Sequence, residues 1–300
     1  INSGWLTMGE NILDFEDKFS KMLGPQIHCS AVSSGTAAMH LAFMAIGIQP
    51  DDEVIIPALT FVSNANCVQL MKAKPILADS NNSTNDWNVS AESIKKVITN
   101  KTKAVVVVHF AGYPCDMKPI VELCKERNIY LIEDCAHSPG ASIDGKMCGT
   151  WGDVGCFSFF SNKNLSVGEG GMTSTKDASI AQKISSLRSH GMTSLTLDRH
   201  KGRSVTYDIS QPGINYRMDE MRAALGLVQL DKLIEGNLSR MKLSNRYREN
   251  FFNTDIKMPF DLDKKSSAIS AFHILPILLP SSVPRLKVIE HLKHNKIQSS

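Results

Sequence analysis

The sequence lacks a long apolar run, an excess of one charge and any C-x-x-C pair. Its longest apolar stretches, such as AVVVV at 104–108, fall far short of the roughly 20 residues that cross a membrane as a helix. The 33 basic residues are nearly balanced by 30 acidic ones, and no basic run occurs. The first residues lack the basic start and apolar stretch of a signal peptide. We therefore expect a soluble protein whose partners include neither nucleic acid nor a membrane.

Cysteine is scarce and odd in number, with seven in 300 residues. An odd count without a signal peptide indicates reduced thiols and a cytoplasmic location. The group that most resembles a metal cluster does not have zinc-site spacing; it consists of Cys124, Cys135, His137, Cys148 and Cys156. We interpret these cysteines as small buried apolar residues and predict no metal site.

Apolar runs and amphipathic stretches alternate through the first two thirds of the chain. The pattern predicts helices at 32–47, after Thr60 and at 116–127, and strands at 53–57, 75–79, 104–110 and 129–134. This order predicts an α/β fold with a mostly parallel central sheet flanked by helices. Because ligands bind at the carboxyl ends of such strands, the polar residues that close them deserve examination. These are His109, Asp134 and Ser158.

The last third of the chain is predicted to be mainly helical. One helical pattern covers 218–252, and the tail adds a strand at 271–279 and a helix at 284–295. We expect a domain boundary within or just after the long helix. The predicted division is a large domain at 1–235 and a partial, smaller α+β domain at 236–300, which is too short for a core of its own.

Residues 140–146 have the glycine–lysine spacing of a phosphate-binding P-loop. However, Met147 stands where a magnesium-binding Ser or Thr is required, and the next residues do not favour a helix. We predict a β-turn at Asp144 and Gly145 instead.

Three local features have both a functional and a structural interpretation. Residues 33–36, SSGT, lie between a predicted strand and helix; they could form an anion site or an ordinary N-cap. Glu133 and Asp134 close a buried strand, and their side chains point to opposite faces of the sheet. One of them could be a buried carboxylate that needs a partner, or it could be an ordinary turn residue at the end of the strand. Lys163 follows a buried strand; it could be a nucleophilic amine in an apolar pocket or a surface lysine.

The combination of the three is more specific than any one of them. An anion site at a helix start, a carboxylate at a strand end and a lysine after a later strand are the three contacts that pyridoxal phosphate requires. The phosphate needs amides and hydroxyls, the pyridine nitrogen needs a carboxylate, and the aldehyde needs a lysine. The sequence therefore predicts a pyridoxal-phosphate site.

The chain closely resembles the DegT/DnrJ/EryC1/StrS family of sugar aminotransferases over nearly its whole length. The matching stretches are SSGTAAMHLA, GIQPDDEVIIPALTFVSNAN, TKAVVVVHFAGYPCDM, LIEDCAHSPGASIDGKMCGTWGDVGCFSFFSNKNLSVGEGGMTST and GINYRMDEMRAALGLVQL. The resemblance implies the type I fold of pyridoxal-phosphate enzymes. It also implies amino transfer to a nucleotide-linked sugar in polysaccharide biosynthesis, and a homodimer with shared active sites. Family members usually extend beyond both ends of this sequence, so we expect a truncated chain.

The resemblance also implies roles for individual residues. Lys163 would form the Schiff base with the cofactor, and Asp134 would pair with the pyridine nitrogen. His137 would lie beside the cofactor, and Phe61 would stack on it. The phosphate ligands would be Gly35, Thr36 and Ser158, and the residues that reach the neighbouring subunit's active site would be Asn215 and Arg217.

The implied reaction is transamination with ping-pong kinetics, through a Lys163 internal aldimine. The amino donor is an amino acid, glutamate by resemblance, and the acceptor is a keto-sugar on a nucleotide diphosphate. One alternative is the family's sugar dehydratases, which have histidine in place of the lysine; another is a non-catalytic regulatory or interaction protein on the same scaffold. The segment 188–203 could bind the diphosphate or be a solvated loop; its cations are Arg188, His190, Arg199, His200, Lys201 and Arg203.

Overall fold

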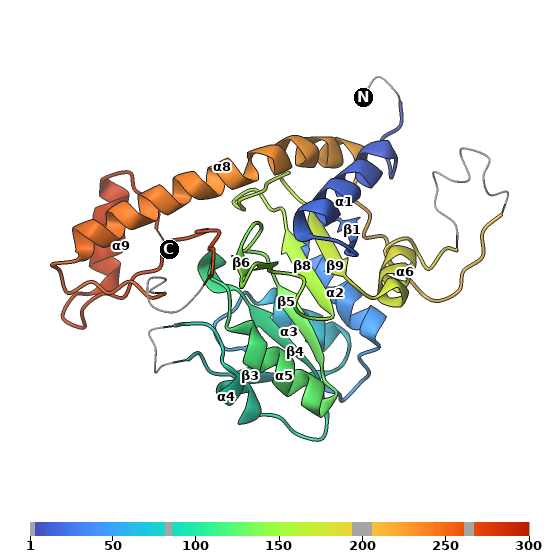
Figure 1. The fold of residues 1–300 in the computed structure, drawn as a ribbon, viewed down its shortest axis with the longest axis horizontal. Helices are drawn as coiled ribbons and strands as arrows, with labels where there is room; N and C mark the ends of the chain where they lie inside the picture. Colours follow the sequence, from blue (N-terminus) through green and yellow to red (C-terminus); the bar gives the residue numbers. More distant parts are fainter. Residues whose placement is uncertain (1–3, 82–85, 194–205, 261–266, 300) are drawn as a thin grey trace.

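The computed structural model describes residues 4–81, 86–193, 206–260 and 267–299. A seven-stranded sheet lies at its centre, in the order β1-β9-β8-β5-β4-β2-β3 (Figure 1). The strands are β1 His28–Val32, β2 Glu53–Pro57, β3 Lys74–Ala78, β4 Thr102–Val108, β5 Tyr130–Asp134, β8 Val154–Ser158 and β9 Gly171–Thr175. From β8 to β3 all neighbouring strands are parallel, and β9 runs antiparallel to β8 and β1. The predicted α/β fold with a mostly parallel sheet is confirmed.

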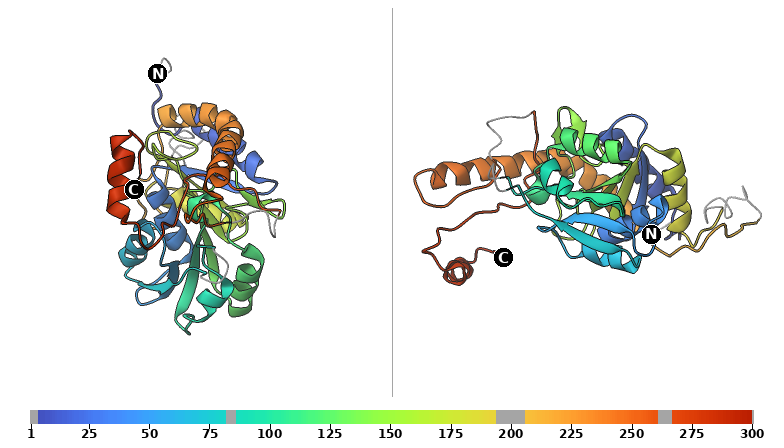
Figure 2. Two further views of the ribbon diagram at one scale, coloured as in Figure 1. Left: turned by 90° about the vertical axis from the view of Figure 1, so that its left-hand side faces the viewer. Right: turned by 90° about the horizontal axis from the view of Figure 1, so that it is seen from below.

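Helices cover both faces of the sheet (Figures 1 and 2). The helical elements are α1 Glu10–Leu23, α2 Gly35–Ile46, α3 Ser63–Leu70, α4 Ala91–Lys95, η1 Phe110–Gly112, α5 Met117–Arg127, α6 Ala178–Leu187, α8 Glu220–Phe251 and α9 Arg285–His294. Apolar side chains of α2, α3 and α6 pack on one face. On the other face, α4 and α5 cover one half and α1 with α8 the other.

The strands alternate strictly between these two layers, as the two-residue period of a strand requires. In β5, Ile132 packs on the α2 side, whereas Leu131 packs on the α5 side. Glu133 and Asp134 continue this alternation to the carboxyl end of the strand. The two neighbouring carboxylates therefore lie in different environments.

The helix α8 runs unbroken from Glu220 to Phe251, through both Gly226 and Gly236. It extends along one side of the molecule towards α9 (Figure 1), which has no buried residue. The predicted domain boundary at residue 235 falls inside this helix, and the division at 1–235 and 236–300 stays a prediction.

The strand predicted at 271–279 is wrong. Among the described residues after Thr175, only isolated bridges occur, such as that between Lys257 and Leu278. The segment instead hydrogen-bonds to η1, with the Ala271 N–H donating to Gly112 O at 3.0 Å and the His273 N–H to Ala111 O at 2.9 Å. A continuous apolar run could not distinguish a strand from a buried irregular segment.

The turn predicted at Asp144 and Gly145 is confirmed. It joins β6 Ser142–Ile143 to β7 Lys146–Met147, and both of its central residues have positive φ, 52° and 73°. That backbone is the condition for a type I′ hairpin turn. In the part of the chain that the structure describes, no helix is both long and apolar enough to cross a membrane.

Candidate active site

A cavity of about 500 Å³ opens at the carboxyl ends of β4, β5 and β8. This is where a parallel sheet places its ligands. Seven of the nine predicted site residues line the cavity: Gly35, Thr36, Phe61, Asp134, His137, Ser158 and Lys163. The structure thus brings together residues that lie more than 100 positions apart in the sequence.

The start of α2 forms one end of the cavity. The Ser34 side chain accepts the Ala37 N–H at 3.0 Å, so the N-cap interpretation is correct for this serine. Because the first helical hydrogen bond comes from Ala38, the N–H groups of Gly35 and Thr36 are left without intrahelical partners. Ser158 lies directly against this turn, and a Cβ at Gly35 would be 2.8 Å from the Ser158 Cβ. The result is a cradle of amides and hydroxyls suited to a phosphate.

Asp134 lies on the buried floor of the cavity. One of its oxygens accepts the Ala136 N–H at 3.0 Å, and the other accepts the Asn64 side-chain amide at 3.0 Å. Burial raises the pKa of Asp134, while these two hydrogen bonds and the charge of Lys163 oppose the rise. The carboxylate keeps acceptor capacity, which a protonated ring nitrogen could use.

Lys163 follows β8 in a turn whose backbone N–H donates to Phe160 O at 2.9 Å. Its side chain is half-buried in the cavity wall. Burial lowers the pKa of Lys163, and the charge of Asp134 partly offsets this. The ion pairs found among the described residues do not include Lys163. A lysine in this state is a better nucleophile than one at the surface.

Two rings line the cavity walls at sites where the sequence predicted contact with a cofactor. Phe61, just before α3, is 70% exposed, and His137 follows β5. The His137 ring stacks on that of His273, with centroids 4.4 Å apart and planes inclined by 29°. Burial first, and then the charge of Lys163, lower the pKa of His137 to about 2. His137 is therefore neutral in the physiological range.

Two predicted residues lie outside this cavity. Asn215 forms an isolated bridge with Ser189, and Arg217 forms one with Val32; neither lines the cavity in this chain. Their expected contact with a neighbouring subunit stays a prediction.

In the segment 188–203, a candidate diphosphate site, the first cation is not available to a ligand. Arg188 is 2% exposed. Its Nη1 donates to Ala31 O at 2.6 Å and to Glu16. Arg188 is therefore part of the core and not available to a substrate. His190 is exposed, whereas Arg199, His200, Lys201 and Arg203 lie outside the described residues.

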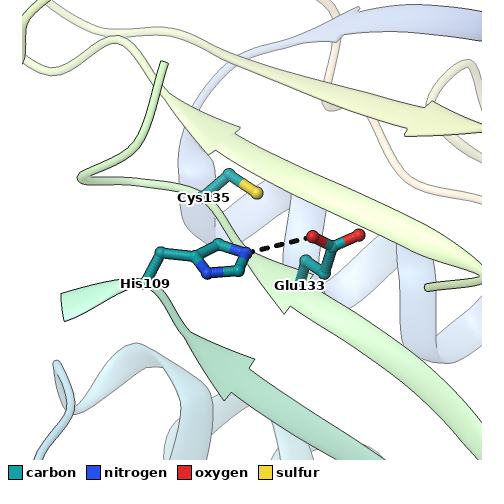
Figure 3. Close-up of side chains that lie close together, drawn as sticks. All are labelled: His109, Glu133 and Cys135. Carbon is teal, nitrogen blue, oxygen red and sulfur yellow. Dashed lines mark hydrogen bonds and ion pairs between the residues drawn. The ribbon is translucent and has the colours of Figure 1, made fainter. Parts of the chain in front are cut away.

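A buried group that does not line the cavity consists of His109, Glu133 and Cys135 (Figure 3). His109 Nδ1 accepts the Cys115 N–H at 3.1 Å, so that atom carries no proton, and His109 Nε2 donates to Glu133 at 3.0 Å. Glu133 also accepts three backbone N–H groups, from Gly149, Trp151 and Gly152. With both of its oxygens accepting two hydrogen bonds, Glu133 acts as a structural anchor and not as a metal ligand.

The fold and the cavity define the class of protein. A cradle that a Cβ would fill at Gly35, a buried carboxylate at Asp134 and a half-buried lysine at Lys163 fit pyridoxal 5'-phosphate. The donor set of the cavity thus agrees with a pyridoxal-phosphate enzyme built on a mostly parallel sheet.

Comparisons with known proteins identify the family. The model of the DegT/DnrJ/EryC1/StrS aminotransferase family matches residues 1–300, and the chain belongs to this family. GDP-perosamine synthase from Escherichia coli O157:H7 is 36% identical over 301 residues, covering 100% of this chain and 78% of that protein.

Solved structures agree with this assignment. The aminotransferase TlmJ from Streptoalloteichus hindustanus matches with a TM-score of 0.89 and 32% identity, covering 98% of this chain and 77% of that one. Spr1654 from Streptococcus pneumoniae, in its PLP form, matches with a TM-score of 0.87 and 26% identity, covering 99% and 78%. The chain is a pyridoxal-phosphate-dependent aminotransferase.

Asn64 and His273 are cavity residues that sequence reasoning missed. Asn64 is 1% exposed and donates to both Asp134 and Thr60. His273 belongs to the segment that was predicted to be a strand. A polar residue inside an apolar pattern was the available signal in both cases, but only the fold shows what each one contacts.

Proposed function

We propose that this chain transfers an amino group from an amino acid, glutamate, to a keto-sugar attached to a nucleoside diphosphate. The observation that carries the proposal is the shared cavity of Lys163, Asp134 and the α2 cradle. The similarity to a GDP-perosamine synthase supports a sugar nucleotide as the acceptor.

Each part of the cavity has a role in this proposal. Gly35, Thr36 and Ser158 would hold the phosphate of the cofactor, and Asp134 would hold its ring nitrogen. Phe61 and His137 would flank its ring, as the family resemblance implies. Pyridoxal phosphate, when bound, draws electrons from the substrate carbon and so makes a proton there removable.

Lys163 has two tasks in the proposal. Its Nζ holds the cofactor covalently between turnovers. Once released, the same Nζ is placed to take a proton from the substrate carbon or to return one. The lowered pKa of Lys163, caused by burial, favours the neutral amine that this proton transfer needs. Because donor and acceptor use one cavity in turn, the kinetics should be ping-pong.

We further propose that the chain acts as a homodimer. Large apolar side chains near the cavity are exposed in the single chain, among them Phe61 by 70%, Val62 by 57% and Phe160 by 42%. A second copy would cover such surface, and it would bring Asn215 and Arg217 to the neighbouring cavity.

Two further proposals come from the sequence. The chain would divide into two domains within α8, and it would be located in the cytoplasm. The seven free cysteines support the cytoplasmic location.

The direct test is mass spectrometry of products from a panel of nucleotide-linked keto-sugars incubated with glutamate and pyridoxal phosphate. An aminated sugar nucleotide, with 2-oxoglutarate as coproduct, is the expected result. Loss of water from the sugar without added nitrogen would contradict the proposal in favour of a dehydratase. A chain that stays colourless after cofactor addition would favour a non-catalytic protein.

Lys163→Ala should remove both the visible absorption of the lysine-bound cofactor and the product. The matched control is Lys21→Ala on the surface of α1, where the lysine pairs with Asp17. Unchanged absorption in the Lys163 variant would contradict the role of this lysine.

A further inference from the structure

The segment after α8 completes one wall of the cavity. Its backbone is held against η1 by the hydrogen bonds of Ala271 and His273. The approach is close because Gly112 has φ 94°, and a Cβ there would be 2.9 Å from the Phe272 nitrogen. His273 and Ile274 consequently line the same cavity as Lys163. This part of the chain therefore supplies side chains to the site.

Asn164, next to Lys163, fixes the orientation of His273. The Asn164 side-chain amide donates to Asn237 Oδ1 and to Ala271 O, both at 2.7 Å. Its remaining group, Oδ1, is an acceptor and lies 2.8 Å from His273 Nδ1. Because a carbonyl oxygen can only accept, the proton of His273 must be on Nδ1. The Nε2 atom of His273 is then without a proton.

His137 carries its proton on the other nitrogen. The Ala111 N–H donates to His137 Nδ1 at 3.3 Å, so a neutral His137 has its proton on Nε2. Burial first, and then the charges of Lys163 and Arg240, lower the pKa of His273 to about 3. The stacked pair therefore consists of two neutral rings with opposite tautomers.

We propose that His273 is a positioning residue for His137, and that the hydrogen bond from His273 to Asn164 ties this stacked pair to the loop of Lys163. The inference rests on the proposed function, in which His137 flanks the cofactor ring. The Ala111 bond restrains His137 at one atom, and the His273 ring fixes its plane. Without the stack, only the Ala111 bond and an edge contact with the Phe110 ring, centroids 6.0 Å apart, would hold His137, and its plane would be less restrained.

The first test needs no cofactor. A long-range ¹H–¹⁵N spectrum of the histidine rings in the cofactor-free chain at pH 7 should show two neutral rings of opposite tautomer for His137 and His273. A protonated ring, or the same tautomer in both, would overturn the proposal. Because no cofactor is present, this result is independent of whether the proposed function is correct.

The second test measures pyridoxal-phosphate affinity in His273→Phe and His273→Leu, which have similar volumes but differ in their ability to stack. An aromatic stack contributes up to about 1.5 kcal/mol, so we expect the leucine variant to bind the cofactor roughly tenfold more weakly than the wild type. The phenylalanine variant keeps the stack but loses the Asn164 bond, and its affinity should lie between those of the wild type and the leucine variant. Equal affinities in both variants would show that the His273 side chain only fills space beside His137, and this would overturn the proposal. His28→Ala, at an exposed histidine, is the control and should leave the affinity unchanged.

Discussion

Glu133 and Asp134 are adjacent carboxylates on one strand, yet their surroundings are opposite. Glu133 is fully buried on the α5 side and accepts hydrogen bonds from one histidine and three backbone N–H groups. Asp134 is on the α2 side, accepts two hydrogen bonds and faces the cavity. The first carboxylate is saturated by the protein, and the second keeps capacity for a ligand.

Burial alone therefore does not mark a functional acid. Burial would raise the pKa of Glu133, but the hydrogen bonds from His109, Gly152 and Gly149 lower it below its ordinary value. The pKa of Asp134 is raised because its two donors do not compensate for burial. We expect Glu133 to contribute to stability and Asp134 to contribute to cofactor binding and activity.

The largest expected effect is on folding. Glu133→Ala should lower the free energy of unfolding by about 3–5 kcal/mol, because it leaves His109 and three backbone N–H groups buried without an acceptor. Chemical denaturation followed by circular dichroism measures this loss. Glu126→Ala, at an exposed glutamate of α5, should change it by less than about 0.5 kcal/mol. If Glu133→Ala and Glu126→Ala both lowered the free energy of unfolding by the same small amount, the structural role of Glu133 would be contradicted.

Asp134→Asn should reduce activity by roughly 10²–10³-fold, as expected for the loss of one fixed electrostatic partner of the reacting system. It should destabilise the cofactor-free chain far less than Glu133→Ala does, because asparagine leaves at most one of the two donors to Asp134 without an acceptor. Since the pKa of Asp134 is raised on folding, its ionisation costs stability as the pH rises through the folded pKa, and asparagine avoids that cost at pH 7. Steady-state kinetics and denaturation of the same sample test both parts. If Asp134→Asn lowered the free energy of unfolding as much as Glu133→Ala does, the distinction between a structural Glu133 and a functional Asp134 would be contradicted.

Gly35→Ala tests the cradle at the other end of the cavity. The new Cβ would be 2.8 Å from the Ser158 Cβ and 3.2 Å from its Cα, so we expect a loss of about 1–3 kcal/mol in stability together with weaker cofactor binding. Gly236→Ala, in α8 with open space around the new Cβ, is the matched control. It should be neutral or stabilising by up to about 1 kcal/mol. Thermal unfolding with and without pyridoxal phosphate separates the two effects, and a Gly35 variant that behaves like the control would contradict the cradle.

The smallest effect should come from Asn64→Leu, which removes one donor to Asp134. We expect a loss of activity of about tenfold, equivalent to one hydrogen bond to a charged group. Asn66→Leu changes the same residue type to the same side chain on the same helix, but at an exposed position, and should leave the rate unchanged. Equal rates in the two variants would show that Asn64 does not support Asp134.

Much of the fold was predictable because its signals are local. The βαβα order, a helix within 32–47 and the turn at Asp144 follow from periodicity and turn chemistry. Opposite faces for Glu133 and Asp134 were also predicted, but the sequence could not say which one meets the cavity. That depends on His109 and on the loop 149–152, whose donors reach Glu133 only after the strands have paired.

The errors have a common physical cause. The strand predicted at 271–279 was wrong because hydrogen bonds to η1 replace sheet pairing there. Arg188 was predicted as a candidate ligand, but it donates to Glu16, which lies 172 residues away in the sequence. Asn64 and His273 were missed for the same reason. Each of these residues is defined by a long-range contact, and no local pattern encodes such a contact.

The central claim is that Lys163 is the residue that holds the cofactor. The most direct measurement is borohydride reduction of the chain after incubation with pyridoxal phosphate, followed by peptide mapping in a mass spectrometer. We predict that the reduced cofactor is attached to the peptide containing Lys163 and that Lys163→Ala shows no attachment in the cavity. Stoichiometric attachment at another lysine, or none in the wild-type chain, would contradict the account.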